Sequence, residues 1–186
     1  MRDTKKTEAS IVNQENSLKL SQQLLEILEK NADADVATVK KLIDQGANVK
    51  FRDVNNATAL MYAAKFNHDA KIIKILIDNG ADVNAHDNFG VTALMQAARR
   101  NNADIVKALL DAGAKETIDN RGWTALFWAV TYTKYPEVIE VLLDAKFNPK
   151  MTDKYMLKPI NYSIKNKMLS EPAGLKIYER LDKESK

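Results

Sequence analysis

The sequence predicts an all-α solenoid, in which short helix–turn–helix units stack on one another. Three stretches repeat one pattern, and their threonines Thr58, Thr92 and Thr124 are 34 and 32 positions apart. Within each stretch, two short apolar helical patterns are joined by a polar turn. A period near 33 residues, built from helical pairs, is typical of repeat arrays whose units bury one another's apolar sides.

The predicted array begins with two helices in residues 17–51. The first is expected in SLKLSQQLLEILEK, and the second in DVATVKKLIDQGANVKF, which ends with a GAN turn aligned with the GAD of the next unit. This pair differs in sequence from the central copies, as expected of a capping unit whose outer face meets water. The preceding residues 1–17, MRDTKKTEASIVNQENS, are polar, and we expect a flexible N-terminal arm there.

The central units carry signals for where their helices begin and end. Thr58, Thr92 and Thr124 each precede an apolar helical run, so they are candidate N-caps. Gly80 and Gly113 follow the second helices, where a left-handed residue is needed to end the helix. Each unit therefore reads as two helices with a defined start and stop.

An apolar stripe on each second helix accounts for the stacking. In KIIKILIDNG the apolar residues recur at spacings of one, three and four and form one face of a helix. The paired alanines of the first helices allow close helix packing. Because no unit can bury this stripe alone, Ile73, Val106 and Ile139 should line up along one buried spine.

The predicted array ends with a second divergent cap. Its first helix is expected in DKYMLKPINYSIKNK, where Pro159 follows the position of the unit's N-cap. Its second helix is expected at about residues 173–181, after a longer loop that contains Pro172.

The repeated segments resemble the ankyrin repeat, whose unit is similar to D-x-x-G-x-T-P-L-H-x-A-A, a second helix, and G-A-D-V-N-A. The matching segments are DNFGVTALMQAARRNNADIVKALLDAGA, DNRGWTALFWAV and NGADVNA. The resemblance covers residues 18–184 and implies about five units: three clear repeats and divergent N- and C-terminal caps. The units are expected at about 18–52, 53–86, 87–118, 119–152 and 153–184.

One departure from the family pattern affects packing. T-P-L-H is here TALM twice and TALF once, a form that resembles ankyrin repeats common in bacteria. The family's His, which ties neighbouring units by hydrogen bonds, is replaced by Met61, Met95 and Phe127. We expect these side chains to pack as apolar residues instead. Trp128, the next residue after Phe127, is also expected in the core.

The resemblance also implies a binding surface. Ankyrin repeats typically bind proteins through hairpin positions and the end of the first helix of each unit. Carried over position by position, these give a predicted contact set: Arg52, Asn55, Lys65, Phe66, His86, Asn88, Phe89, Val91, Arg99, Arg100, Asn120, Arg121, Trp123, Thr131, Tyr132 and Tyr155. The set is rich in aromatic residues and arginine, which are enriched in binding hot spots, and it has no carboxylate.

The repeated carboxylates and the histidines have structural interpretations. Asp53, Asp87, Asp119 and Asp153 recur at the first position of each unit, where Asp side chains form turns with nearby backbone N–H groups. Only two histidines occur, one of them His68 at an inter-helix turn, and their spacing fits no metal-binding motif.

The sequence favours a binding protein over an enzyme. It has no cysteine, and no phosphate-binding glycine loop or nucleophile elbow occurs. We therefore expect no catalytic residues, no metal site and no cofactor. No apolar run is long enough to span a membrane, and no signal peptide is visible. The default expectation is a cytoplasmic protein, with a periplasmic or secreted one as the alternative if a leader has been removed.

The predicted partner is another protein with an acidic and partly apolar surface. Nucleic-acid binding through the same basic and aromatic face is an alternative, although a formal net charge of +3 is small for that function. Self-assembly through an exposed end is a second alternative to the expected monomer. The sequence does not identify the partner.

Overall fold

The computed structural model describes residues 2–30 and 34–186, and its regular secondary structure is helical. The helices are α1 (Arg2–Lys30), α2 (Val36–Asp44), α3 (Ala59–Phe66), α4 (Ala70–Asp78), α5 (Ala93–Arg100), α6 (Ala103–Asp111), α7 (Ala125–Tyr132), α8 (Glu137–Asp144), the 3-10 helices η1 (Pro159–Lys165) and η2 (Lys167–Leu169), and α9 (Pro172–Ser185). Over these two ranges no strand forms, and isolated bridges join Arg52 to Thr58 and His86 to Thr92. The all-α prediction is confirmed.

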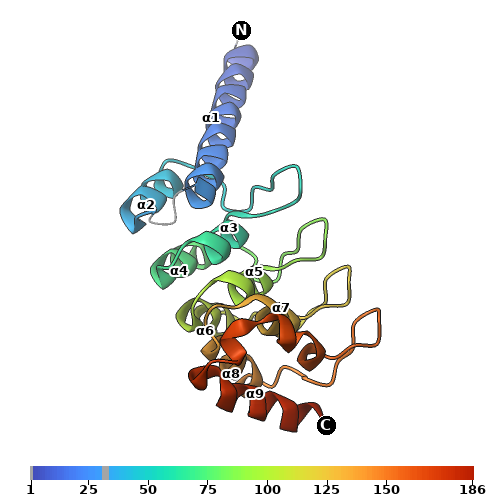
Figure 1. Ribbon diagram of the computed structural model, residues 1–186. Coiled ribbons are helices and arrows are strands. Elements are labelled where there is room, and N and C mark those ends of the chain that lie inside the picture. Colours follow the sequence, from blue (N-terminus) through green and yellow to red (C-terminus); the bar gives the residue numbers. More distant parts are fainter. Residues whose placement is uncertain (1, 31–33) are drawn as a thin grey trace.

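The helices are arranged in two rows, which Figure 1 shows side by side. The inner row consists of α1, α3, α5, α7 and η1, each packed on the next, and the outer row consists of α2, α4, α6, α8 and α9. Long loops connect successive pairs and project from one side of the stack (Figure 1). The predicted solenoid is therefore confirmed. We propose that its units have the boundaries expected from the sequence.

Capping contacts explain where the central helices begin. Thr58 Oγ1 accepts a hydrogen bond from the Met61 N–H, and Thr92 Oγ1 accepts one from the Met95 N–H, both at 3.4 Å. Thr124 holds the predicted N-cap position of α7, but its side chain makes no cap bond. The helix ends agree with the sequence, because Gly80 and Gly113 have positive φ angles of 91° and 88°.

The core runs continuously along both rows. Ile73, Val106 and Ile139 are fully buried on α4, α6 and α8, which pack in succession and form the expected spine. In the inner row the alanine pairs at 63–64 and 97–98 are also fully buried, which allows close approach of the helices. The side chains that replace the expected histidine are buried as well: Met61, Met95 and Phe127.

The N-terminal segment differs from the expected arm. Helix α1 begins at Arg2 and continues without a break past residue 17, so no change of structure occurs at the predicted boundary. Its first half extends beyond the stack (Figure 1), and the side chains of residues 11–16 are exposed. The helix joins the stack at Ser17, whose hydroxyl donates a hydrogen bond to the Gly46 carbonyl at 2.7 Å.

The C-terminal cap also differs from the expected helical pair. Its second helix is present as α9, but Pro159–Lys165 forms the 3-10 helix η1 where an α-helix was expected. The Ser163 hydroxyl donates to the Ile160 carbonyl, a local side-chain bond of the kind that competes with α-helical pairing. Asn161 accepts from the Lys158 N–H and so caps the start of η1.

Candidate functional site

One aspartate organises the turn in each connecting loop. Asp53 Oδ1 accepts hydrogen bonds from the N–H groups of Asn55 and Ala57, both at 2.8 Å. The same pair of bonds recurs at each later repeat, with residues two and four positions on as the donors: Asp87, Asp119 and Asp153. The prediction that these carboxylates form turns is confirmed.

Neighbouring loops are tied to each other through their backbones. The Asn88 N–H donates to the Asn55 carbonyl at 3.0 Å, and the Asn120 N–H donates to the Phe89 carbonyl at 2.9 Å. The Lys154 N–H donates to the Arg121 carbonyl at 3.3 Å. The loops therefore form one connected surface along the stack.

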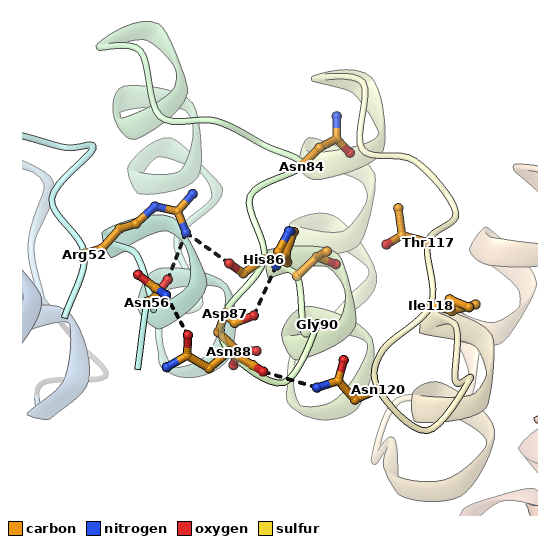
Figure 2. A pocket seen from close by; sticks show the side chains of 11 residues that line it. Arg52, Asn56, Asn84, His86, Asp87, Asn88, Gly90, Thr117, Ile118 and Asn120 are labelled. Atoms are coloured by element: carbon orange, nitrogen blue, oxygen red, sulfur yellow. Dashed lines mark hydrogen bonds between the residues drawn. The ribbon is translucent and has the colours of Figure 1, made fainter. Parts of the chain in front are cut away.

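Several members of the predicted contact set reinforce this connection. As Figure 2 shows, Arg52 Nη1 donates to the carbonyls of Asn56 and His86, at 3.1 and 3.0 Å. The Asn56 amide donates to Asn88 Oδ1 at 2.6 Å, and the Asn120 amide donates to the Asn88 carbonyl at 3.2 Å (Figure 2). These side chains line a groove of about 690 Å³. Their polar groups already serve the scaffold, which leaves fewer of them for a partner.

Apolar side chains at the loop tips remain exposed. Phe89 and Tyr155, both in the predicted contact set, are 61% and 79% exposed. Val54 and Ile118, from neighbouring loops, are 94% and 55% exposed. The imidazole of His86 is exposed as well, with Nδ1 3.1 Å from the Asp87 carbonyl. The tips therefore offer apolar surface at regular intervals.

Three members of the predicted contact set are buried, which corrects the expectation that they face a partner: Val91, Trp123 and Thr131. Trp123 packs edge-on against Tyr162, with ring centroids 4.8 Å apart, and its Nε1–H donates to Asp153 Oδ2 at 3.1 Å. The Thr131 hydroxyl donates to the Phe127 carbonyl inside its own helix at 2.8 Å. These side chains hold the C-terminal cap and α7 in place.

Two arginines lie against aromatic residues in and just before α7. The guanidinium carbon of Arg121 lies 4.2 Å from the Trp123 ring centroid and 4.5 Å from that of Trp128, and the guanidinium forms an ion pair with Asp119 at 2.9 Å. Arg99 of α5 also approaches this aromatic group. Its guanidinium carbon is 5.1 Å from the Trp128 ring and 4.9 Å from the Tyr132 ring. Trp128 is buried, as expected.

The carboxyl ends of α3, α5 and α7 meet in a second pocket of about 480 Å³, which we call the basic basin. Its lining residues are Lys65, Phe66, His68, Arg99, Arg100, Tyr132, Lys134 and Tyr135. Lys134 and Tyr135 are new members that sequence reasoning missed. They lie in the turn TYTKYPE, whose extra residue relative to RRNNAD is the signal that could have indicated them.

The basic basin holds four positive charges that form no ion pair in the part of the chain that the structure describes. Within residues 2–30 and 34–186, Lys65, Arg99, Arg100 and Lys134 form no ion pair. Burial lowers the pKa of the Lys65 ammonium, with further lowering by Arg100 and Arg99, while Glu29 acts in the opposite direction. Burial and then Arg100 lower the pKa of Arg99 in the same way. The basin therefore brings like charges together, with Lys65 and Arg99 partly buried and Arg100 and Lys134 exposed.

His68 has the structural role expected of it. Its Nδ1 lies 2.9 Å from Asn101 Oδ1 in the next unit. In the described part of the chain, no cluster of three or more potential metal-ligating side chains occurs.

Comparison with known families agrees with this architecture. A family model described as ankyrin repeats, in three copies, matches residues 24–87 and 67–153. The chain belongs to the ankyrin-repeat family. Ankyrin repeats are generally modules for protein–protein interaction and are typically non-enzymatic. A search of curated proteins returned no match to this ankyrin-repeat chain. None of its described helices has both the length and the apolar character needed to cross a bilayer.

Proposed function

We propose that this ankyrin-repeat protein binds a partner protein through its inner-helix row and projecting loops, and that the partner surface is acidic and partly apolar. The carrying observation is the basic basin, where Lys65, Arg99 and Arg100 lie unpaired beside exposed Tyr132. A partner carboxylate would supply the missing opposite charge. The exposed Phe89 and Tyr155 at the loop tips would supply apolar contact area.

The charges of the basic basin should affect which partner binds more than how tightly it binds. Charges arranged in complementary patterns speed association and exclude partners of the wrong sign. Because Arg99 and Arg100 are adjacent in the last turn of α5, reversing both charges changes the basin by four units of charge. Arg121 is a poorer test position, since it also pairs with Asp119 and packs on Trp123.

A selection of displayed random peptides on the purified protein would test this function. We expect selected peptides to be enriched in Asp and Glu together with aromatic residues. The double variant Arg99→Glu/Arg100→Glu should bind a selected peptide at least about tenfold more weakly, a loss of about 1.4 kcal/mol. Fluorescence anisotropy measures this change, and far-ultraviolet circular dichroism checks the fold.

Lys107→Glu provides a matched control, because Lys107 is exposed on the outer helix α6. It should leave peptide affinity unchanged. Peptides without acidic enrichment, or equal affinity for the double variant, would contradict the proposal. Binding of single-stranded DNA that exceeds binding of the acidic peptides would favour nucleic acid as the ligand instead.

A further inference from the structure

The basic basin gathers four cations in one pocket. The helix lysines Lys30, Lys40 and Lys74 each form an ion pair with a carboxylate one turn away. In the described structure, the four cations of the basin have no such pair, although they come from three successive units. A cation in the last turn of a helix interacts favourably with the helix dipole. This interaction explains a single charge at one helix end, but it does not explain why four cations line the same pocket.

Arg99 is held in a position suited to an oxyanion. Its guanidinium lies against the Trp128 and Tyr132 rings, 5.1 and 4.9 Å from their centroids. Within residues 2–30 and 34–186, the Arg99 guanidinium forms no ion pair and donates no hydrogen bond. Arg99 therefore keeps donors for a planar, two-pronged contact of the kind that arginine makes with phosphate.

The amount of uncompensated charge favours a dianion over a single carboxylate. Lys65, Arg99, Arg100 and Lys134 line one pocket, so one carboxylate would leave most of their mutual repulsion in place. A phosphate monoester carries about −1.5 to −2 charges at neutral pH and three acceptor oxygens. The remaining lining residues all carry rings: Phe66, His68, Tyr132 and Tyr135.

We propose that the basic basin binds an aryl phosphate monoester, the group that a phosphorylated tyrosine side chain of a partner protein would present. The volume of about 480 Å³ lies within the usual range of small-ligand sites. In this arrangement Arg99 and Arg100 contact the phosphate oxygens, Lys65 and Lys134 add charge, and the aromatic residues contact the ring. This proposal rests on the proposed function and specifies the partner's chemistry at one site.

Phenyl phosphate is the direct probe. Its binding is monitored through chemical-shift changes in the two-dimensional NMR spectrum of the intact protein. The chain has two tryptophans, and the indole N–H of Trp128 beside Arg99 should respond. We expect saturable shifts with phenyl phosphate and at least about tenfold weaker binding of benzoate, which has the same ring and one charge.

Two variants and two further ligands complete the test. Arg99→Glu/Arg100→Glu and the milder Lys65→Gln should each weaken binding of phenyl phosphate, while Lys107→Glu should not. Inorganic phosphate should bind more weakly than phenyl phosphate, because it lacks the ring. Vesicles that contain a phosphoinositide should bind no better than phosphoinositide-free vesicles of equal charge.

The outcomes separate this proposal from the function on which it rests. Equal binding of benzoate and phenyl phosphate, or no saturable shift with phenyl phosphate, overturns the phosphate site even if acidic peptides bind normally. Preferential binding of phosphoinositide vesicles overturns it in favour of a lipid headgroup. If the protein binds neither phenyl phosphate nor acidic peptides, both proposals are overturned.

Discussion

At the scale of single residues, Asp153 combines its turn bonds with bonds from two aromatic side chains. Its Oδ1 accepts the two turn bonds, and its Oδ2 accepts from the Tyr162 hydroxyl at 2.5 Å and from Trp123 Nε1 at 3.1 Å. Burial alone would raise its pKa, but the bonds from Tyr162, the backbone and Trp123 together lower it. The bond to Asp153 is also the main reason why the pKa of Tyr162 rises to about 12.

We predict that Asp153→Asn lowers the free energy of unfolding at pH 7 by about 1–3 kcal/mol, because buried donors lose a charged acceptor. The pKa of Asp153 is lower in the folded protein than in the unfolded chain. Its stabilisation is therefore present above the ordinary carboxyl pKa and is lost as pH falls through the folded value. Urea unfolding at neutral and acidic pH measures this, and the cost of the variant should shrink in acid.

Asp87→Asn is the matched control for this prediction. Asp87 makes the same two turn bonds, but no aromatic side chain in the described structure donates to it. It should cost less at pH 7. A cost for Asp153→Asn that stays the same at acidic pH would contradict the electrostatic explanation.

At the scale of helices, buried asparagines connect successive members of the inner row. Asn101 follows α5, and its amide donates to the carbonyls of Ala64 and Asn67 at the end of α3, at 3.1 and 2.7 Å. Asn166 makes equivalent bonds to the carbonyls of Val130 and Thr133 at the end of α7. The last carbonyls of a helix lack partners within that helix, and here the next unit supplies them.

We predict that Asn101→Ala costs about 1–3 kcal/mol of unfolding free energy, because buried carbonyls are left without a donor. Asn88→Ala removes an inter-unit amide at an exposed position and should cost less than about 1 kcal/mol. Chemical denaturation of both variants measures the difference. Similar costs would show that the asparagines between helices do not act as inter-unit caps.

At the scale of the whole molecule, stability should be shared unequally between the middle and the C-terminal end. Helix α6 is packed between α4 and α8 in the outer row, whereas α9 packs on α8 from one side and covers the short 3-10 helices. In a stack of this kind, each unit depends on its nearest neighbours. Loss of packing at the two places should therefore have different consequences.

We predict that Ile105→Ala and Ile177→Ala, both at buried positions, each remove about 2–5 kcal/mol of local packing. Ile105→Ala should destabilise the stack as a unit. Ile177→Ala should release α9 before the remainder unfolds. Hydrogen exchange measured by mass spectrometry distinguishes these outcomes, and uniform loss of protection in Ile177→Ala would contradict the predicted order.

The sequence was sufficient for the architecture because the fold repeats its own signals. Thr58, Gly80 and the apolar stripe around Ile73 recur at fixed intervals, so each unit supports the interpretation of the next. The structure differs from the expectation at two places, where local side-chain bonds replace α-helical ones or where an expected cap bond is missing. Ser163 and its neighbours form local side-chain bonds that favour a 3-10 helix, and Thr124 occupies the N-cap position without a cap bond.

The site was less predictable, because the family pattern fixes where a residue lies in its unit and not what covers it. Trp123 and Thr131 occupy expected contact positions, yet Tyr162 of the C-terminal cap packs over Trp123, and Thr131 faces inward. Arg99, Arg100 and Tyr132, all from the predicted contact set, line the basic basin together, and their role in binding stays a prediction. Lys134 was missed, because an additional residue in its turn shifts it relative to the family pattern.

The backbone bonds between successive loops have an evolutionary consequence. Since main-chain N–H and C=O groups join Asn88 to Asn55 and Asn120 to Phe89, these links do not depend on which side chains the tips carry. Mutation can therefore exchange an exposed tip residue such as Phe89 while the loops keep their spacing. A lineage that carries this stack can acquire new ligands by small steps, without first having to evolve a new framework.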